Sequence, residues 1–167
     1  FTSRKGLERA NGEIATLNEK LKDENLKMSL ELDVARHIQE IVLPPKTEYS
    51  AFPDLDIACK MVPATEVGGD YYDTIRVSPH GLFTIGDVTD HGLQSGIVMM
   101  MVHTAIRSLS HIISNDLKKI FAVANDIIYE FRTKTDDYRF ISLLLLQYTG
   151  QGTFKMLLAL SVAGFPR

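Results

Sequence analysis

The feature that most constrains this chain is a run of helix-forming residues from about Leu7 to Leu43 that contains no proline. Apolar side chains recur along this run at alternating steps of three and four residues, which is the spacing of a coiled-coil seam. They are Leu7, Ala10, Ile14, Leu17, Leu21 and Met28. Pro44 and Pro45 then end the run, because proline cannot continue a helix and restricts the residue before it. We therefore predict one long helix over residues 1–43.

The seam of this predicted helix is irregular in its middle. Glu24 occupies the next seam position, and after Met28 the apolar spacing restarts at Leu32, so that two four-residue steps adjoin. Such a stutter locally unwinds a supercoil. Two interpretations remain open. The helix is either a parallel dimeric linker that carries a signal, which we favour, or a single helix that packs on its own domain or spaces it.

The charge and cysteine content limit the partners of the chain. A net charge of −3 argues against nucleic acid or an anionic membrane surface as the main partner, since both require concentrated positive charge. Cys59 is the one cysteine and cannot form an internal disulfide, which predicts a cytoplasmic location. The sequence contains no apolar stretch long enough to span a membrane. Because the chain does not begin with Met, we expect it to belong to a longer protein with an upstream sensor domain. Any membrane attachment is expected in that upstream region.

Beyond Pro45 the sequence changes to a strand-rich pattern. We predict strands at about 55–62, 71–77, 82–85, 139–148 and 153–162, and amphipathic helices at about 93–113 and 116–131. Strands followed by two helices and then further strands indicate an α+β architecture, with helices layered on an antiparallel sheet. The predicted organisation is a helical linker over residues 1–43 and a second domain over residues 44–167.

Two glycine-preceded aspartates occur at predicted strand boundaries. Gly68-Gly69-Asp70 comes just before one strand, and Gly86-Asp87-Val88 ends another and leads towards a helix. Glycine allows positive φ or close backbone approach, and carboxylates at such positions suit a hard, oxygen-ligated cation such as Mg²⁺ or Mn²⁺. We therefore predict that Asp70 and Asp87 share a divalent metal. The alternative is a pair of ordinary turns, since Gly-Gly-Asp is common in turns and aspartate caps helices.

These segments also carry a resemblance to a known family. The run from Glu31 to about Gly150 resembles the SpoIIE-like branch of the bacterial PPM-type (phosphatase 2C-like) protein serine/threonine phosphatases. The matching pieces are Leu32–Gln39 with Leu43-Pro44-Pro45, Pro63-Ala64, Glu66–Asp73, Ile85–Gly92 and the apolar helix that follows. Many relatives have glycine where this chain has Asp90, and the additional negative charge is expected to alter metal affinity.

The resemblance implies an α-β-β-α sandwich with a two-metal Mn²⁺ or Mg²⁺ centre. In that family a metal-activated water attacks phosphoserine or phosphothreonine directly. The match implies that Asp87 bridges both metals, that the Val88 carbonyl is a further ligand and that Asp70 is a second carboxylate of the site, with Glu66 as a weaker candidate. It also implies a phosphorylated regulatory protein as substrate, such as an anti-sigma-factor antagonist, and a homodimer formed through the N-terminal helix.

One departure from the family pattern limits this expectation. Relatives carry two later acidic motifs that supply the remaining metal ligands, and nothing after Gln147 matches them. The resemblance therefore implies an incomplete ligand set and an unfinished sheet that exposes apolar surface, so full activity is not expected of this chain. Two alternatives follow. One is a catalytically inactive signalling or dimerisation fragment; the other is a diguanylate-cyclase-like enzyme, to whose Gly-Gly-Asp hairpin Gly68-Gly69-Asp70 is similar.

Overall fold

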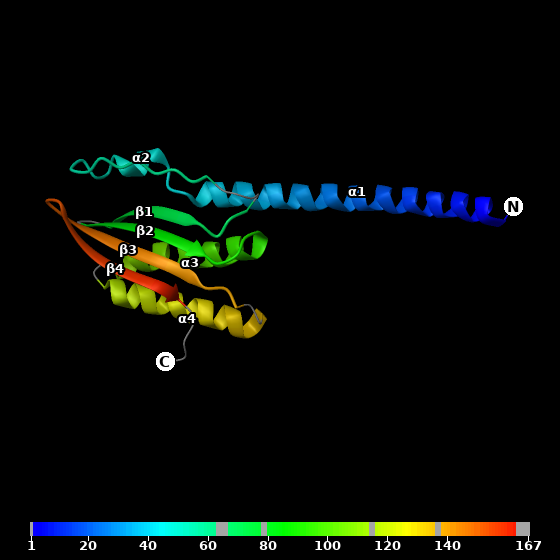
Figure 1. Cartoon of the computed structure of the whole chain (residues 1–167). Helices are drawn as coiled ribbons and strands as arrows, with labels where there is room; N and C mark the ends of the chain where they lie inside the picture. Colours follow the sequence, from blue (N-terminus) through cyan, green and yellow to red (C-terminus); the bar gives the residue numbers. More distant parts are fainter. Residues whose placement is uncertain (1, 63–66, 78–79, 114–115, 136–137, 163–167) are drawn as a thin grey trace. The chain divides into compact units, whose positions relative to one another are not determined.

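The computed structural model describes residues 2–62, 67–77, 80–113, 116–135 and 138–162 (Figure 1). The chain divides into two compact units, Phe1–Val34 and Ala35–Arg167. Helix α1 (Thr2–Val42) provides the first unit and continues into the second, where Ala35 and Val42 are half-buried and Gln39 is buried. The predicted long helix is therefore present, although the compact units divide inside it and not at its end.

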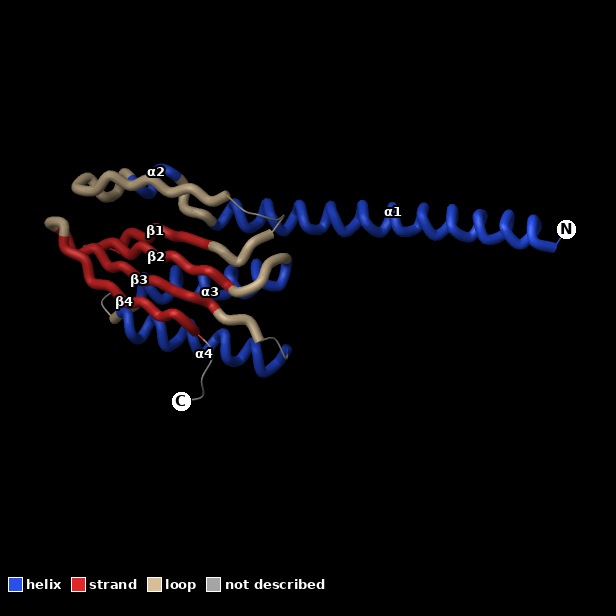
Figure 2. Tube along the Cα trace, in the orientation of Figure 1, coloured by secondary structure: helices blue, strands red, loops and turns tan. Residues whose placement is uncertain are grey.

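The second unit is built on one antiparallel sheet. Its four strands lie in the order β1 (Tyr71–Val77), β2 (His80–Val88), β3 (Ile141–Gly150) and β4 (Thr153–Val162). Helices α3 (Leu93–Ile112) and α4 (Leu117–Thr135) connect β2 to β3 and cover one face of this sheet (Figure 2). The α+β prediction is confirmed, and most predicted elements agree within a few residues.

The core lies between the sheet and these two helices. Alternate residues of each strand point towards the helices, as the two-residue period of a strand requires. The largest fully buried side chains include members of β1, β3, α3 and α4: Ile75, Leu143, Leu145, Met99, Ile106, Ile120 and Ile128. Each such side chain contributes roughly 1.5–3 kcal/mol by leaving water. This packing fixes the strands on which the candidate site is placed.

The opposite, outer face of the sheet is only partly covered. Helix α2 (Lys46–Tyr49) and the irregular segment after it reach this face, where the ring of Phe52 lies 5.1 Å from the ring of Phe83. Elsewhere the outer face leaves Ile85, Met156 and Leu158 more than half exposed. Within the described residues there is no second sheet over this face, so the part of the sandwich that is present is one sheet and its helices.

The strand predicted at 55–62 is wrong, because the structure has irregular backbone there. A strand is stabilised by hydrogen bonds to a neighbouring strand, and none of the described strands pairs with this segment. In contrast, β2 extends to Val88, three residues beyond its predicted end. Gly86, Asp87 and Val88 are therefore the last residues of a strand and do not form a turn.

None of the helices among the described residues combines the length and apolar character needed to cross a membrane.

Candidate metal centre

The structure places Asp70, just before β1, beside Asp87 near the end of the neighbouring strand β2. Tyr71 is paired with Gly86, and the Val88 N–H donates to the Gly69 carbonyl at 3.3 Å, so residue 70 lies directly opposite residue 87. Both carboxylates are exposed on the outer face of the sheet. The structure thus brings together the two aspartates that the sequence selected, whereas their binding of a metal stays a prediction.

The electrostatics of this pair favour a cation. Burial raises the pKa of the Asp87 carboxyl, and the negative charge and side-chain hydrogen bond of Asp70 raise it further. Two carboxylates this close disfavour each other's ionised form, and a divalent cation between them would remove that cost. Among the described residues, the basic side chains in ion pairs contact other acids and neither member of this pair. The oxygen donors therefore fit a hard ion such as Mg²⁺ or Mn²⁺.

Two glycines allow the strands to approach closely at this point. A Cβ atom on Gly69 would lie 2.5 Å from the Val88 carbonyl oxygen and 2.8 Å from the Val88 Cβ. A Cβ atom on Gly86 would overlap the ring of Tyr71. Neither glycine has a positive φ, so close approach is the reason for both. The Val88 carbonyl, predicted as a further ligand, consequently lies against the residue that precedes Asp70.

The described part of the chain supplies only some of a metal's ligands. It contains no group of three or more His, Cys, Asp or Glu side chains arranged to hold a metal. Glu66, the weaker candidate, lies outside the described residues. His91 is exposed, and its backbone N–H donates to the Asp90 carboxylate at 2.9 Å. The described site consists of two carboxylates and a neighbouring carbonyl.

The turn before Asp70 is held by a side chain that the sequence analysis missed. Gln39, near the end of α1, donates from Nε2 to the Gly68 carbonyl at 2.8 Å and accepts from the Gly68 N–H at 3.3 Å. Its side chain is buried, so both bonds are protected from water. A polar residue in line with Ala35 and Val42 on the apolar stripe was the available signal. The end of α1 is therefore hydrogen-bonded directly to the turn that presents Asp70.

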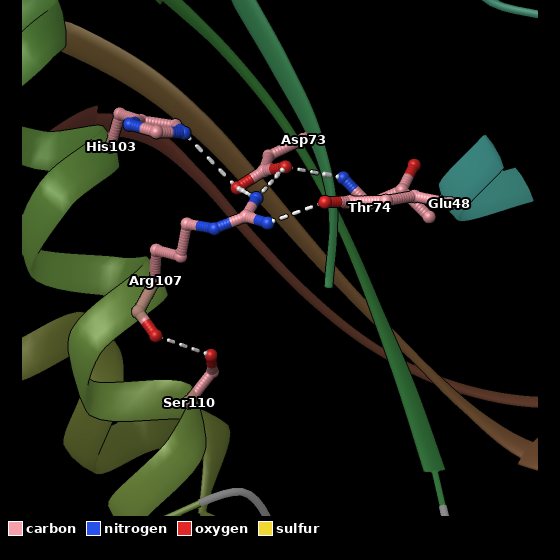
Figure 3. Close-up of polar contacts among 6 residues, drawn as sticks. All are labelled: Glu48, Asp73, Thr74, His103, Arg107 and Ser110. Atoms are coloured by element: carbon pink, nitrogen blue, oxygen red, sulfur yellow. Dashed lines mark hydrogen bonds and ion pairs between the residues drawn. The ribbon is translucent and has the colours of Figure 1, made fainter. Parts of the chain in front are cut away.

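A buried ion-pair network lies on the other face of β1 (Figure 3). The Arg107 guanidinium, on α3, lies 2.6 and 2.9 Å from the two carboxylate oxygens of Asp73 and 2.7 Å from Oε1 of Glu48 on α2. The Thr74 N–H also donates to Asp73 at 2.7 Å. His103 Nε2 lies 3.1 Å from Asp73, within ion-pair distance, although neither ring nitrogen makes a well-aligned hydrogen bond. The network ties α2, β1 and α3 together.

Asp73 is a charged group in the interior, and its partners keep it ionised. Burial raises the pKa of the Asp73 carboxyl, but its contacts with His103 and Arg107 outweigh burial and leave the pKa below its usual value. Its side chain is 1% exposed, so the charge depends on these partners and not on water. Because Asp73 lies three residues after Asp70 on the same segment, this network supports the strand that carries the candidate site.

An apolar cavity lies near the carboxylate pair but does not coincide with it. It has a volume of about 630 Å³ and lies between the segment 55–62 and the outer face of β1 and β2. Asp70 contributes to its wall, but most of the lining is apolar and Asp87 is not part of it. The cavity therefore lies beneath the irregular segment and is too apolar for a hard cation. The exposed carboxylates of Asp70 and Asp87 are the groups suited to bind one.

Comparison with known proteins adds to this geometry. A sequence model of the family described as Stage II sporulation protein E (SpoIIE) matches residues 80–160, which include β2, both core helices and most of β4. The SiaA-PP2C domain of Pseudomonas aeruginosa is similar in fold, with a TM-score of 0.57 and 17% sequence identity over 81% of this chain and 68% of that domain. Over residues 80–160 the chain is thus SpoIIE-like in sequence, and its fold is similar to that of a PP2C domain.

A second solved structure contains the RsbU and RsbW domains of Rv1364c from Mycobacterium tuberculosis. It matches with a TM-score of 0.44 and 21% identity, over 59% of this chain and 27% of that one. The similarity to the SiaA-PP2C domain supports the expected fold class. In this chain Asp70 immediately precedes β1, and Asp87 is the second-last residue of β2. Phosphatases of this fold family are typically metal-dependent.

Proposed function

We propose that the SpoIIE-like domain is part of a Mn²⁺- or Mg²⁺-dependent phosphatase that hydrolyses phosphoserine or phosphothreonine on a regulatory protein. The observation that carries this proposal is the pairing of the Asp70 and Asp87 carboxylates at neighbouring positions of the sheet edge, where burial and the proximity of Asp70 raise the pKa of Asp87. The family match and the fold similarity support the reaction class. They favour it over a diguanylate-cyclase-like activity.

The chain's own residues would have distinct roles in this reaction. Asp87 and Asp70 would hold the cation from opposite strands, and the Val88 carbonyl would add a neutral oxygen ligand. Gly69 permits the close approach that aligns these groups, while Gln39 fixes the turn. When bound, a divalent cation would activate a water and neutralise charge on the phosphoryl group.

Replacing Asp87 with asparagine tests the proposed reaction, because the change keeps the side-chain shape and removes the charge. With p-nitrophenyl phosphate as the probe, we expect the wild-type chain to show Mn²⁺-stimulated hydrolysis and Asp87→Asn to lose at least about 90% of it, since loss of a ligand removes the metal-dependent step. Asp23→Asn, on the exposed surface of α1, is the matched control and should retain the wild-type rate.

One observation favours a second candidate function. The described residues provide two carboxylates and no larger ligand cluster, as a catalytically inactive signalling fragment would. Mn²⁺ binding by the wild-type chain without any Mn²⁺-stimulated hydrolysis would support this alternative and contradict an active phosphatase.

We also propose that α1 forms a parallel homodimer that connects the domain to an upstream sensor. Every described side chain from residue 4 to residue 31 is exposed, and the predicted seam residues Leu7, Ile14, Leu17, Leu21 and Met28 are each more than half exposed. A second copy of the helix would bury this seam.

Replacing Leu17 with aspartate should therefore abolish the dimer, because a charge at a seam position would be buried without a partner. Sedimentation velocity is expected to give the dimer mass for wild type and the monomer mass for Leu17→Asp. Asn18→Asp places the same charge beside the seam and should leave the dimer intact. A monomeric wild-type chain at high micromolar concentration would refute the proposed dimer.

A further inference from the structure

The loop that follows Asp87 and Val88 has an unusual backbone. Residues 89–92 connect β2 to α3, and Asp90 within them has a φ of 69°. This left-handed conformation is uncommon for residues other than glycine, asparagine and aspartate. The Asp90 side chain accepts the His91 N–H at 2.9 Å through Oδ1, which leaves Oδ2 for another partner. The conformation of the loop therefore depends on the hydrogen-bond partners of the Asp90 carboxylate.

Arg139, just before β3, is the partner of this carboxylate. Its Nη2 donates to Asp90 Oδ2 at 3.3 Å, and its Nε donates to Ser95 Oγ at 3.2 Å. Ser95 lies fully buried in the first turn of α3 and donates its own hydroxyl to the Thr89 carbonyl at 3.2 Å. The Arg139 side chain is only 16% exposed. A single guanidinium thus joins the loop, the start of α3 and the start of β3.

Backbone hydrogen bonds extend this anchor to both halves of the carboxylate pair. The Thr89 N–H donates to the Phe140 carbonyl at 2.8 Å, and the Phe140 N–H donates to Thr89 Oγ1 at 3.0 Å. At the other end of the loop, the Gly92 N–H donates to the Val67 carbonyl at 3.1 Å, three residues before Asp70. A displaced loop would consequently shift the backbone next to Asp70 as well as the backbone next to Asp87.

We infer that Arg139 is a positioning residue for the candidate divalent-cation site. It holds the loop 89–92 through Asp90 and Ser95. It thereby keeps the carboxylates of Asp70 and Asp87 and the Val88 carbonyl in the relative positions needed to bind one cation. The inference rests on the proposed function in one respect, namely that the group held by the carboxylates is a divalent cation. Residues that orient metal ligands typically change metal affinity by about 10- to 100-fold when they are replaced.

Positioning and simple electrostatics predict opposite effects of losing this arginine. Arg139 is a positive charge near a cation site, so its removal should strengthen cation binding if only Coulomb repulsion matters. If Arg139 positions the ligands, its removal should weaken cation binding. The sign of the change in Mn²⁺ affinity therefore separates the two explanations.

The experiment is a calorimetric titration of the full chain with Mn²⁺ for wild type, Arg139→Met and Ser95→Ala. We expect Arg139→Met to weaken Mn²⁺ binding by about tenfold, the lower end of the range for residues that orient ligands. Ser95→Ala changes no charge and should weaken binding in the same direction. Hydrogen exchange of the metal-free chain should show faster exchange of the His91 and Gly92 amides in Arg139→Met, which requires neither metal nor activity.

Two control variants make the outcome decisive. Arg76→Met removes the same charge from an exposed position on β1, about 20 Å along the strand from Asp70, and should leave Mn²⁺ affinity unchanged. Asp87→Asn reports on the proposed metal site itself. If Asp87→Asn weakens binding while Arg139→Met leaves it unchanged or strengthens it, the positioning role is refuted and the metal site stands. If Asp87→Asn has no effect, the proposed metal site fails and the hydrogen-exchange result alone decides whether Arg139 orders the loop.

Discussion

Replacing Arg107 with methionine is expected to lower the free energy of unfolding by about 3 kcal/mol, because it leaves the buried Asp73 carboxylate without its main cation. This figure is the lower end of the range for removing one partner of a buried ion pair, since the Arg107 side chain is itself 34% exposed. Urea unfolding at pH 7 measures the change. Lys134→Met breaks the exposed ion pair with Glu130 and should cost no more than about 1 kcal/mol.

The loss of stability in Arg107→Met should also depend on pH. Because the pKa of Asp73 is lowered in the folded chain, its contribution is fully present above its unfolded pKa of about 3.9 and is lost as the pH falls through the lowered folded value. Without Arg107 the pKa of Asp73 would be higher than in wild type, because burial raises it and only His103 would remain to lower it. The difference in stability between wild type and Arg107→Met should therefore narrow as the pH falls from 7 towards 4. A difference that is constant with pH would show that lost packing, and not the ion pair, causes the destabilisation.

Replacing Gly69 with alanine is expected to disturb both stability and the carboxylate pair. The new methyl group would meet the Val88 carbonyl oxygen and Cβ, which are fixed in the sheet, and such overpacking typically costs about 1–3 kcal/mol. To relieve the overlap, the segment before β1 must move away from the end of β2, which separates Asp70 from Asp87. We therefore expect a lower melting temperature and Mn²⁺ affinity reduced by at least about tenfold, as for other residues that orient ligands.

Gly68→Ala is the matched control for this change. A Cβ atom at Gly68 would approach nothing closer than the Asp70 nitrogen at 3.9 Å, so alanine fits without displacement. Its melting temperature and Mn²⁺ affinity should remain close to those of wild type. Equal effects of the two substitutions would contradict the close approach of Gly69 to Val88 as the reason for glycine at that position.

The sequence predicted the elements whose pattern is local. The long proline-free helix, the two amphipathic helices and the apolar strands around Leu145 and Leu157 all follow from spacing and composition. The segment 55–62 was mistaken for a strand because its alternation is only one requirement for a strand. The other requirement is a neighbouring strand to pair with, and the local sequence does not show whether one is present.

The candidate site shows the same division between local and long-range information. Asp70 and Asp87 could be selected from the sequence because each follows a glycine at a strand boundary, and the register of β1 with β2 then places them together. Arg107 and Arg139 could not be selected, because each acts through a contact with a residue 34 or more positions away. Gln39 was marked only by its place on the apolar stripe of α1, and its partner Gly68 lies 29 positions away. The roles of these side chains can be recognised only once the fold brings their partners within hydrogen-bond distance.

The most direct test of a divalent-cation site at Asp70 and Asp87 is calorimetric titration of the full chain with Mn²⁺ at several pH values. We predict that Asp87→Asn and Asp70→Asn each weaken binding at least about tenfold, since each removes a charged ligand. The wild-type affinity should fall with decreasing pH at a higher pH than an ordinary carboxylate would give, because burial and Asp70 raise the pKa of Asp87 and protons compete with the metal. Equal Mn²⁺ affinity in the wild type and both variants would contradict a metal site at this pair.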